Sequence, residues 1–209
     1  MAIFKVAKRS VNSFNCESWN GEDGSYEEEI VCKYPDPRDL DNLMKYCFNG
    51  ARYVLPVNIQ LYGPESVASQ FLYVQKCSGK NLTTRAHHFI LSFNTGQYEK
   101  FVDESTIDII MYFFALRYLK GHQAVLFLHT NKKSHYHVHI VIDPVNFRTY
   151  KTFRYNIKEL KLDFASTILK DFGIALQGVT YLNENHKVRI GNESDIYQYQ
   201  YLLGKVYYI

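Results

Sequence analysis

The chain has 209 residues, 46% of them hydrophobic, which is enough for one well-buried core and leaves little room for a second full domain. We therefore expect one domain over residues 1–209, either alone or as the N-terminal part of a longer protein. The formal net charge of +3 permits a polyanionic partner but falls short of the strongly basic composition that would demand one.

The first third of the chain predicts a strand followed by two helices. Residues 2–8 alternate well enough for a strand, and the polar stretch 10–29 predicts a loop. Apolar residues recur at helical spacing in 38–50, which places Tyr46 near the end of a short helix. A second helix is expected from Gly63-Pro64 to the break at residue 79.

The middle of the chain predicts a strand, a helix and a hairpin. Residues 87–94 read as a strand, and 104–121 predict a strongly apolar helix with a Ser or Thr cap at its start. Two β-type runs, 124–129 and 135–143, are separated by the five-residue segment 130–134. This spacing is typical of a β-hairpin.

The last part of the chain predicts one more helix, from about 156 to 172, and three short strand-like segments at 178–182, 187–191 and 197–203. Hairpin strands mixed with helices indicate an α+β fold, with a central antiparallel β-sheet and helices packed on its faces.

Cysteine spacing and hydropathy bear on the protein's location. Cys16, Cys32, Cys47 and Cys77 form no CxxC pair, and the sequence has neither a signal peptide pattern nor an apolar run long enough to span a bilayer. We expect a reducing, cytoplasmic setting and no membrane insertion.

Aromatic residues make up 16% of the chain, with 18 Tyr and 14 Phe. We expect most of these rings to lie in the core, although so high a content also suits a protein on which the bases of single strands stack.

Three histidines alternate along the predicted strand 135–143. Because neighbouring side chains of a strand point to opposite sides, His135, His137 and His139 share one face. His129 ends the preceding strand, so the hairpin can bring it to the same row. Imidazoles bind divalent metal ions, and such a row is costly to bury unless something binds it. The spacing therefore favours a functional site over structural filler.

This histidine row is compatible with two kinds of chemistry. His129, His137 and His139 could hold a metal ion that polarises a phosphate. The same HYHVHIV pattern also matches the histidine triad nucleotide hydrolases and transferases, in which His137 would attack a phosphate without metal. The local pattern leaves both open.

Three longer blocks resemble the conjugative relaxases, specifically the MobP-like group of the HUH endonuclease superfamily, and occur in that family's order. They are DLDNLMKYCFNGARY at 39–53, RAHHFILSF at 85–93 and HTNKKSHYHVHIVID at 129–143. The resemblance runs through most of the chain. It implies an HUH endonuclease (relaxase) fold and a single relaxase catalytic domain.

The resemblance implies a metal-dependent DNA relaxase. Such an enzyme nicks single-stranded DNA at a transfer origin by tyrosine transesterification, and its 5′-phosphotyrosine intermediate starts conjugative transfer of a plasmid or integrative element. The first block assigns the nucleophile to Tyr46, with Tyr53 as a second candidate in the same block.

The third block of the resemblance assigns the metal ligands to His129, His137 and His139, with Mn or Mg as the divalent ion. The role of His135 stays open between a partner at the mouth of the site and an alternative ligand or phosphate contact.

Two positions depart from the family pattern. Asn131 stands where the family usually has Asp, and Asp143 stands where Asn is common. The missing acid removes a group that could orient a ligand histidine or help to deprotonate the tyrosine.

The resemblance also implies DNA contacts and partners. We expect His88, Arg85, Lys132 and Lys133 to contact DNA, and Lys80 could contact a phosphate. The expected partners are single-stranded DNA at the transfer origin and accessory DNA-binding and coupling proteins, in the bacterial cytoplasm.

Three other hypotheses compete with the relaxase. A rolling-circle replication initiator carries the same metal motif but places its tyrosine after the histidine pair, where Tyr150 and Tyr155 are available. The others are a histidine triad nucleotide hydrolase and a non-catalytic metal-binding or DNA-binding module. The order of the three blocks favours the relaxase.

Overall fold

The computed structural model describes residues 2–6, 34–94, 102–131, 135–154, 156–174, 179–182 and 187–190. Within them the elements are β1 (Ala2–Val6), α1 (Pro37–Phe48), β2 (Ala51–Val57), α2 (Pro64–Cys77), β3 (His87–Asn94), α3 (Glu104–Tyr118), β4 (His122–His129), β5 (His135–Asn146), α4 (Ile157–Phe172), β6 (Val179–Leu182) and β7 (Lys187–Ile190).

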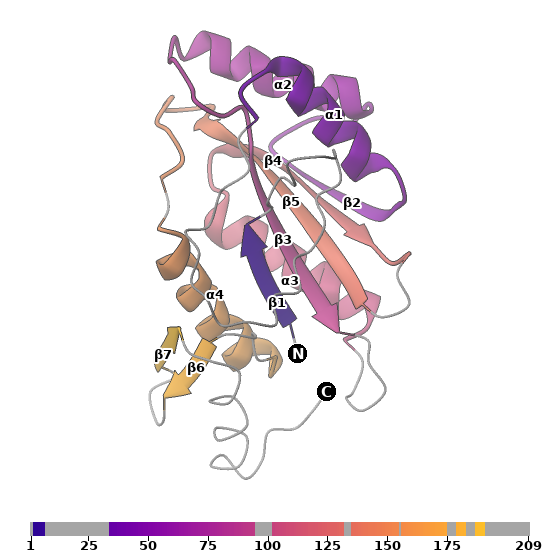
Figure 1. Ribbon diagram of the computed structural model, residues 1–209, viewed down its shortest axis with the longest axis vertical. Helices are drawn as coiled ribbons and strands as arrows, with labels where there is room; N and C mark the ends of the chain where they lie inside the picture. The colour runs from indigo at the N-terminus through magenta and orange to yellow at the C-terminus, as the bar shows by residue number, and fades with distance from the viewer. Residues whose placement is uncertain are drawn as a thin grey trace, which may run out of the picture.

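A five-stranded antiparallel sheet forms the centre of the molecule, in the order β1-β3-β5-β4-β2. Figure 1 shows β5 between β3 and β4, so the strand that carries the alternating histidines lies in the middle of the sheet. β6 and β7 pair with each other in a separate ribbon beside α4 (Figure 1).

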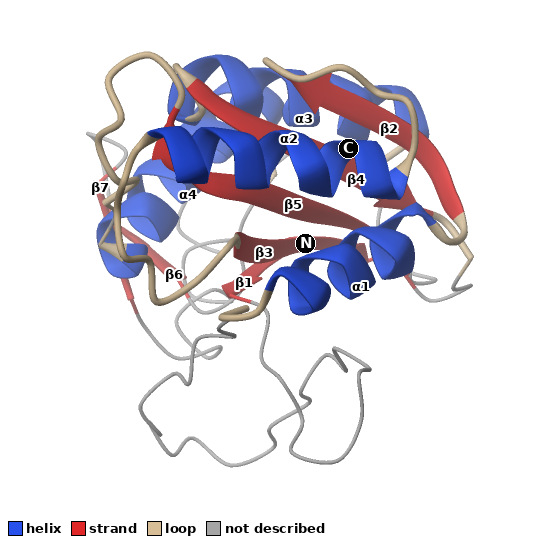
Figure 2. Ribbon diagram, turned by 90° about the horizontal axis from the view of Figure 1, so that it is seen from above, coloured by secondary structure: helices blue, strands red, loops and turns tan. Residues whose placement is uncertain are grey.

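Helices cover both faces of the sheet. α1 and α2 lie on one face, and α3 lies on the other (Figure 2). On β5, Ile140 packs with residues of α3 and α4, whereas Val141 packs with residues of α1 and α2. Every residue of β4 is buried, as expected for a strand that is covered on both sides.

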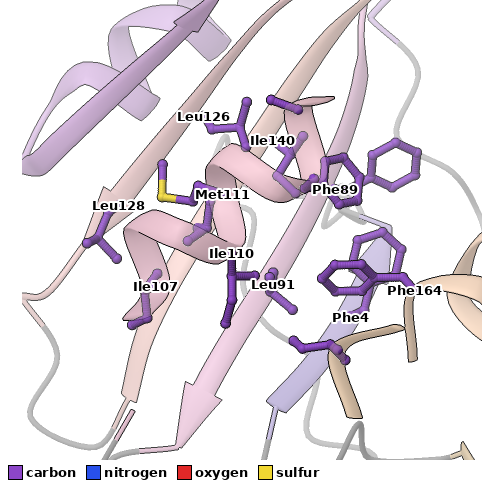
Figure 3. Close-up of a cluster of buried hydrophobic side chains, with 14 of the residues drawn as sticks. Phe4, Phe89, Leu91, Ile107, Ile110, Met111, Leu126, Leu128, Ile140 and Phe164 are labelled. Carbon is purple, nitrogen blue, oxygen red and sulfur yellow. The ribbon is translucent and has the colours of Figure 1, made fainter. Parts of the chain in front are cut away.

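The larger core lies between the sheet, α3 and α4. Figure 3 shows Phe4 of β1, Phe89 of β3 and Phe164 of α4 packed together, and the Phe4 ring centroid lies 5.6 Å from that of Phe89 and 5.5 Å from that of Phe164. Ile107 and Met111 of α3 pack over the central strands. This core packs against the face of the sheet that is opposite α1 and α2.

Local sequence explains why α1 begins and ends where it does. Asp36 caps the helix by accepting a hydrogen bond from the Arg38 backbone, Pro37 occupies the first turn, and Asp39 completes a capping box. The helix ends before Gly50, whose φ of 79° is left-handed. Its buried face consists of Leu40, Leu43, Met44 and Cys47.

The α+β prediction is confirmed, and so are most of the expected elements, including 187–190 as β7. The expectation that Ser or Thr caps α3 was wrong. The cap is Asp103, whose side chain accepts a hydrogen bond from the Thr106 backbone. The expected loop 10–29 and the segment 197–203 lie outside the described residues. No helix in the part of the chain that the structure describes is long and apolar enough to cross a membrane.

One strand, β2, was missed in the sequence. It contains Pro56, and its burial pattern does not alternate cleanly. β2 pairs with β4 and lies at the edge of the sheet, where a proline without an N–H group is tolerated.

Candidate metal centre

The fold brings three of the predicted histidines together on the face covered by α1 and α2. His129 and His137 are directly opposite each other on β4 and β5, and His139 follows two residues later on the same face. The ring centroids lie 4.8–5.0 Å apart. One ligand atom from each ring lies within 4.8 Å of the others, and all three side chains are buried. We call this group the histidine cluster.

A backbone carbonyl fixes the orientation of His129. Its Nε2 lies 2.8 Å from the carbonyl oxygen of Cys47, and because a carbonyl can only accept, Nε2 must carry the proton. Nδ1 is then the nitrogen that can face an ion. Burial lowers the pKa of His129, and the hydrogen bond to Cys47 raises it by less. The ring is therefore neutral near pH 7, the form in which imidazole binds metal.

A chain of side-chain hydrogen bonds fixes the orientation of His139. Its Nδ1 lies 2.9 Å from Nε2 of His88, and Nδ1 of His88 lies 2.9 Å from the hydroxyl oxygen of Tyr34. Because Nδ1 of His139 is engaged by His88, Nε2 is the atom that can bind an ion shared with His129 and His137. Metal-binding histidines commonly have such a partner on the second ring nitrogen, and it sets the tautomer and the ring angle.

The position of His88 corrects its expected role in DNA binding. Its side chain is 1% exposed, and its two ring nitrogens face Tyr34 and His139. It therefore has no surface for a DNA phosphate, and it orients His139 instead. Tyr34 was not identified in the sequence, because nothing in the spacing between residues 34 and 88 indicates that they meet.

Tyr46 lies against the histidine cluster. Its ring centroid is 5.4 Å from that of His139, with the rings nearly perpendicular at 80°. The side chain is half-buried at the edge of the buried face of α1. The neighbouring residue, Cys47, accepts the hydrogen bond from His129. The last turn of α1 thus contacts two of the three histidines.

The other candidate tyrosines lie elsewhere. Tyr53 pairs with Leu128, whose side chain is in the core on the α3 side, so Tyr53 is on the face opposite the histidine cluster. Tyr150 follows the far end of β5, and Asn146 at that end lies seven positions beyond His139, about 23 Å along the strand. Tyr155 lies outside the described residues.

The remaining predicted residues are placed as follows. The Arg85 side chain donates hydrogen bonds to the Pro35 carbonyl at 3.4 Å and to Gln75 at 3.4 Å, so its guanidinium is already held within the protein. Asn131, which follows β4, is exposed and lies beside Gly50, which is in the turn after α1. The structure describes only the backbone of His135, which pairs with Asn94.

Two of the lysines expected to contact DNA, Lys132 and Lys133, lie outside the described residues. Lys80 is exposed, and its Nζ donates to the Thr152 hydroxyl at 3.2 Å.

Asp143 is buried on β5 but lies away from the histidine cluster. It lies four residues beyond His139, about 13 Å along the strand. Its Oδ1 accepts hydrogen bonds from the Val145 backbone at 2.9 Å and from Gln75 at 3.2 Å. Burial raises the pKa of this carboxyl to about 7, and the two hydrogen bonds lower it by less. Asp143 therefore orients no histidine of the cluster.

The donor set fits a divalent ion. Three imidazoles on one face leave the other coordination positions to substrate oxygens or water. A second group with ligand atoms within 4.8 Å consists of Cys47, His88 and His139. In that group His88 and His139 are already joined by a hydrogen bond, so the histidine cluster is the better match to an ion.

Comparison with known proteins gives one family. A family model described as relaxase, MobA/VirD2-like, nuclease domain matches residues 46–170, more than half of the chain. The match begins at Tyr46 and includes the whole histidine cluster. No curated protein and no solved structure matches the chain.

Proposed function

This chain belongs to the MobA/VirD2-like relaxase family of nuclease domains, and we propose that Tyr46 is the nucleophile with which it nicks single-stranded DNA at a transfer origin. Family membership makes it a DNA-nicking relaxase of the HUH superfamily. The observation that carries the finer proposal is the contact of Tyr46 with His139, at a ring-centroid distance of 5.4 Å.

In the proposed reaction the phenolic oxygen of Tyr46 attacks the phosphorus atom of the scissile phosphodiester. The bond from phosphorus to the 3′-oxygen breaks, the 3′-oxygen takes up a proton, and a 5′-phosphotyrosine remains. The phosphate ester is kept rather than hydrolysed, so the reverse reaction can rejoin the strand. A nick of this kind is what the start of conjugative transfer of a plasmid or integrative element requires.

Each residue of the site has a proposed role. His129, His137 and His139 would hold a divalent ion, which when bound would polarise the phosphate and stabilise charge on its oxygens. His88 and Tyr34 hold the His139 ring in place. A phenol ordinarily has a pKa of about 10, so Tyr46 would need a bound cation or a base beside it to lose its proton at neutral pH.

The donor set supports manganese over magnesium among the expected ions. Magnesium strongly prefers oxygen ligands, whereas imidazole suits later and softer divalent ions. No carboxylate belongs to the histidine cluster among the described residues. We therefore propose Mn²⁺ as the better activator of the two.

The alternatives receive less support. A rolling-circle initiator would need Tyr150, which lies beyond the far end of β5, or another tyrosine after the histidines. A histidine triad hydrolase would use His137 without metal and without any tyrosine. Its mechanism gives no reason for the contact between Tyr46 and His139.

The test is the formation of a covalent adduct between the protein and a single-stranded oligonucleotide from the transfer origin of its own element, with Mn²⁺. We expect a slower-migrating band on a denaturing gel from the wild type, none from Tyr46→Phe, and none with a chelator. Tyr53→Phe is the matched control and should form the adduct. An adduct that persists in Tyr46→Phe would move the nucleophile to another residue.

A further inference from the structure

A second feature on the same face of the sheet is a cavity of about 640 Å³ between α2 and the turn that follows β5. Its walls include three aromatic rings, those of Tyr73 from α2 and of Phe147 and Tyr150 from the turn, and the amide of Gln123 from β4. We propose that this cavity binds one unpaired nucleobase of the single-stranded substrate. The inference rests on the proposed action on single-stranded DNA and adds a place where the enzyme recognises it.

The aromatic walls suit a flat ring. The Tyr73 side chain is 70% exposed and that of Tyr150 is 42% exposed, so both rings are open to solvent where they line the cavity. A hydrogen bond with Cys77 is the main cause of a raised pKa of Tyr73, so its phenol is uncharged at neutral pH. Bases of single strands stack on such rings whatever their sequence, because every base has a π-face.

Gln123 adds a group that can read the edge of a base. The side chain is 9% exposed, and its Oε1 has no hydrogen-bond partner among the described residues. A buried amide oxygen without a partner is costly to the free protein. Rotation about the last side-chain bond can turn either end of the amide toward the cavity, because this torsion is broad. An amide offers the donor and acceptor pair that base edges match.

The turn that carries Tyr150 is held in a strained conformation. Tyr150 has a left-handed φ of 54°, which is uncommon for a bulky residue. Asn146 maintains it, since its carbonyl accepts from the Tyr150 backbone at 2.8 Å and its side chain accepts from the Thr149 backbone at 3.0 Å. Strain of this kind persists where the surrounding structure enforces it, and it concentrates at ligand sites.

The cavity is placed to share one DNA strand with the histidine cluster. Gln123 and His129 lie on the same strand, β4, six positions apart; Gln123 lines the cavity beside α2 and His129 contacts the last turn of α1, so both are on the face that these helices cover. The distance between them along the strand is about 20 Å. Val125 and Phe127, which lie between these two residues, are buried under α1 and α2, so a single strand that places one base in the cavity while held at the cluster runs over these helices.

A positive charge lies next to the cavity, on Arg148, which follows the lining residue Phe147. The guanidinium carbon of Arg148 is 5.4 Å from the centroid of the Phe147 ring, and the arginine is exposed. An arginine here can pair with the phosphate that flanks the bound base.

The test measures binding of a fluorescently labelled thymidine oligonucleotide by anisotropy, in the presence of a chelator. This binding assay needs neither metal nor catalysis. A failure of the nicking proposal would appear in a different experiment, as absence of the covalent adduct. We expect Tyr73→Ala and Gln123→Leu each to weaken binding about tenfold. Tyr112→Ala is the matched control, since Tyr112 is 57% exposed on α3, on the opposite face, and should bind as the wild type.

A photocrosslinking arm identifies the bound group. Oligonucleotides with 5-bromodeoxyuridine should crosslink to peptides that contain Tyr73 or Tyr150. Unchanged affinity in Tyr73→Ala and Gln123→Leu together with crosslinks confined to other peptides would overturn the proposal. If free thymidine monophosphate instead bound as tightly as the oligonucleotide, with the same loss in Tyr73→Ala, the cavity would be a nucleotide site rather than a DNA site.

Discussion

His129 donates a hydrogen bond from Nε2 to the carbonyl oxygen of Cys47 at 2.8 Å, and this bond ties the end of β4 to the last turn of α1. Tyr46 precedes Cys47, so the same bond that fixes the tautomer of a candidate metal ligand also fixes the backbone beside the candidate nucleophile. The contact between the end of β4 and the last turn of α1 thus positions both His129 and Tyr46.

The Tyr34 hydroxyl supports His139 through His88, so its removal should weaken metal binding. We expect Tyr34→Phe to lower Mn²⁺ affinity severalfold and His88→Ala to lower it about 10- to 100-fold, the usual effect of losing the group that orients a ligand. Isothermal titration calorimetry measures both. Tyr118→Phe is the control, because it removes a hydroxyl bonded to Asp163 at 2.6 Å far from the cluster. Equal affinities in all four proteins would contradict the positioning role.

Asp143→Asn should stabilise the protein at neutral and higher pH. In the folded state burial raises the pKa of Asp143 to about 7, whereas in the unfolded chain it is 3.8. The folded state therefore binds more protons between these values, and its stability falls as the pH rises through them. Asparagine has no charge to bury, so above pH 7 the free energy of unfolding of the variant should exceed that of the wild type by up to about 4 kcal/mol.

Urea unfolding at pH 4 and pH 8 measures this gain. Asp163→Asn is a control of opposite sign: Arg117 lowers the pKa of Asp163 below its ordinary 3.8, so the variant should be less stable than the wild type at pH 8, and most of this difference should already be present at pH 4. A gain for Asp143→Asn that is independent of pH would show that the charge of Asp143 is not its cause.

His87 should produce a loss of stability in acid. Burial, and to a lesser extent repulsion from His122, lowers the pKa of His87 to about 4 from an ordinary value of 6.5. The unfolded chain then binds the proton first, so the folded state loses stability as the pH falls from about 6.5 to about 4. His87→Gln should abolish about 3 kcal/mol of that loss, measured by urea unfolding at pH 7 and pH 4. An identical pH dependence in wild type and variant would rule out this role.

α1 should depend on its buried face to hold Tyr46 in place. Met44 is fully buried between the helix and the sheet, and Met44→Ala should cost about 2–5 kcal/mol of unfolding free energy. The exposed Asn42 on the same helix gives the control, since Asn42→Ala should change stability by less than about 0.5 kcal/mol. Chemical denaturation measures both, and a small effect of Met44→Ala would mean that α1 is only loosely packed.

Much of the fold could be predicted because periodicity reports burial directly. Alternation along β5 correctly placed His137 and His139 on one face, and the hairpin brought His129 opposite them. β2 was missed because Pro56 obscures its pattern. The face of Tyr53 could not be predicted either, since an irregularity in pairing between Ala51 and Tyr53 shifts the register.

The supporting contacts of the site left no sequence signal. Tyr34 and His88 lie 54 residues apart and meet through tertiary structure alone. Cys47 acts through its backbone carbonyl, which any residue type would supply. The DNA-binding assignment of His88 was wrong for a related reason: a histidine in a family motif does not reveal whether it faces the substrate or another histidine.

Mass spectrometry of the protein after reaction with its origin oligonucleotide and Mn²⁺ identifies the nucleophile directly. Trypsin cleaves after Lys45 and Arg52, so Tyr46 lies in the peptide YCFNGAR, apart from Tyr53 and from every other tyrosine. If Tyr46 is the nucleophile, this peptide carries the 5′-phosphonucleotide on its tyrosine. A nucleotide on any other peptide, with YCFNGAR unmodified, would contradict it.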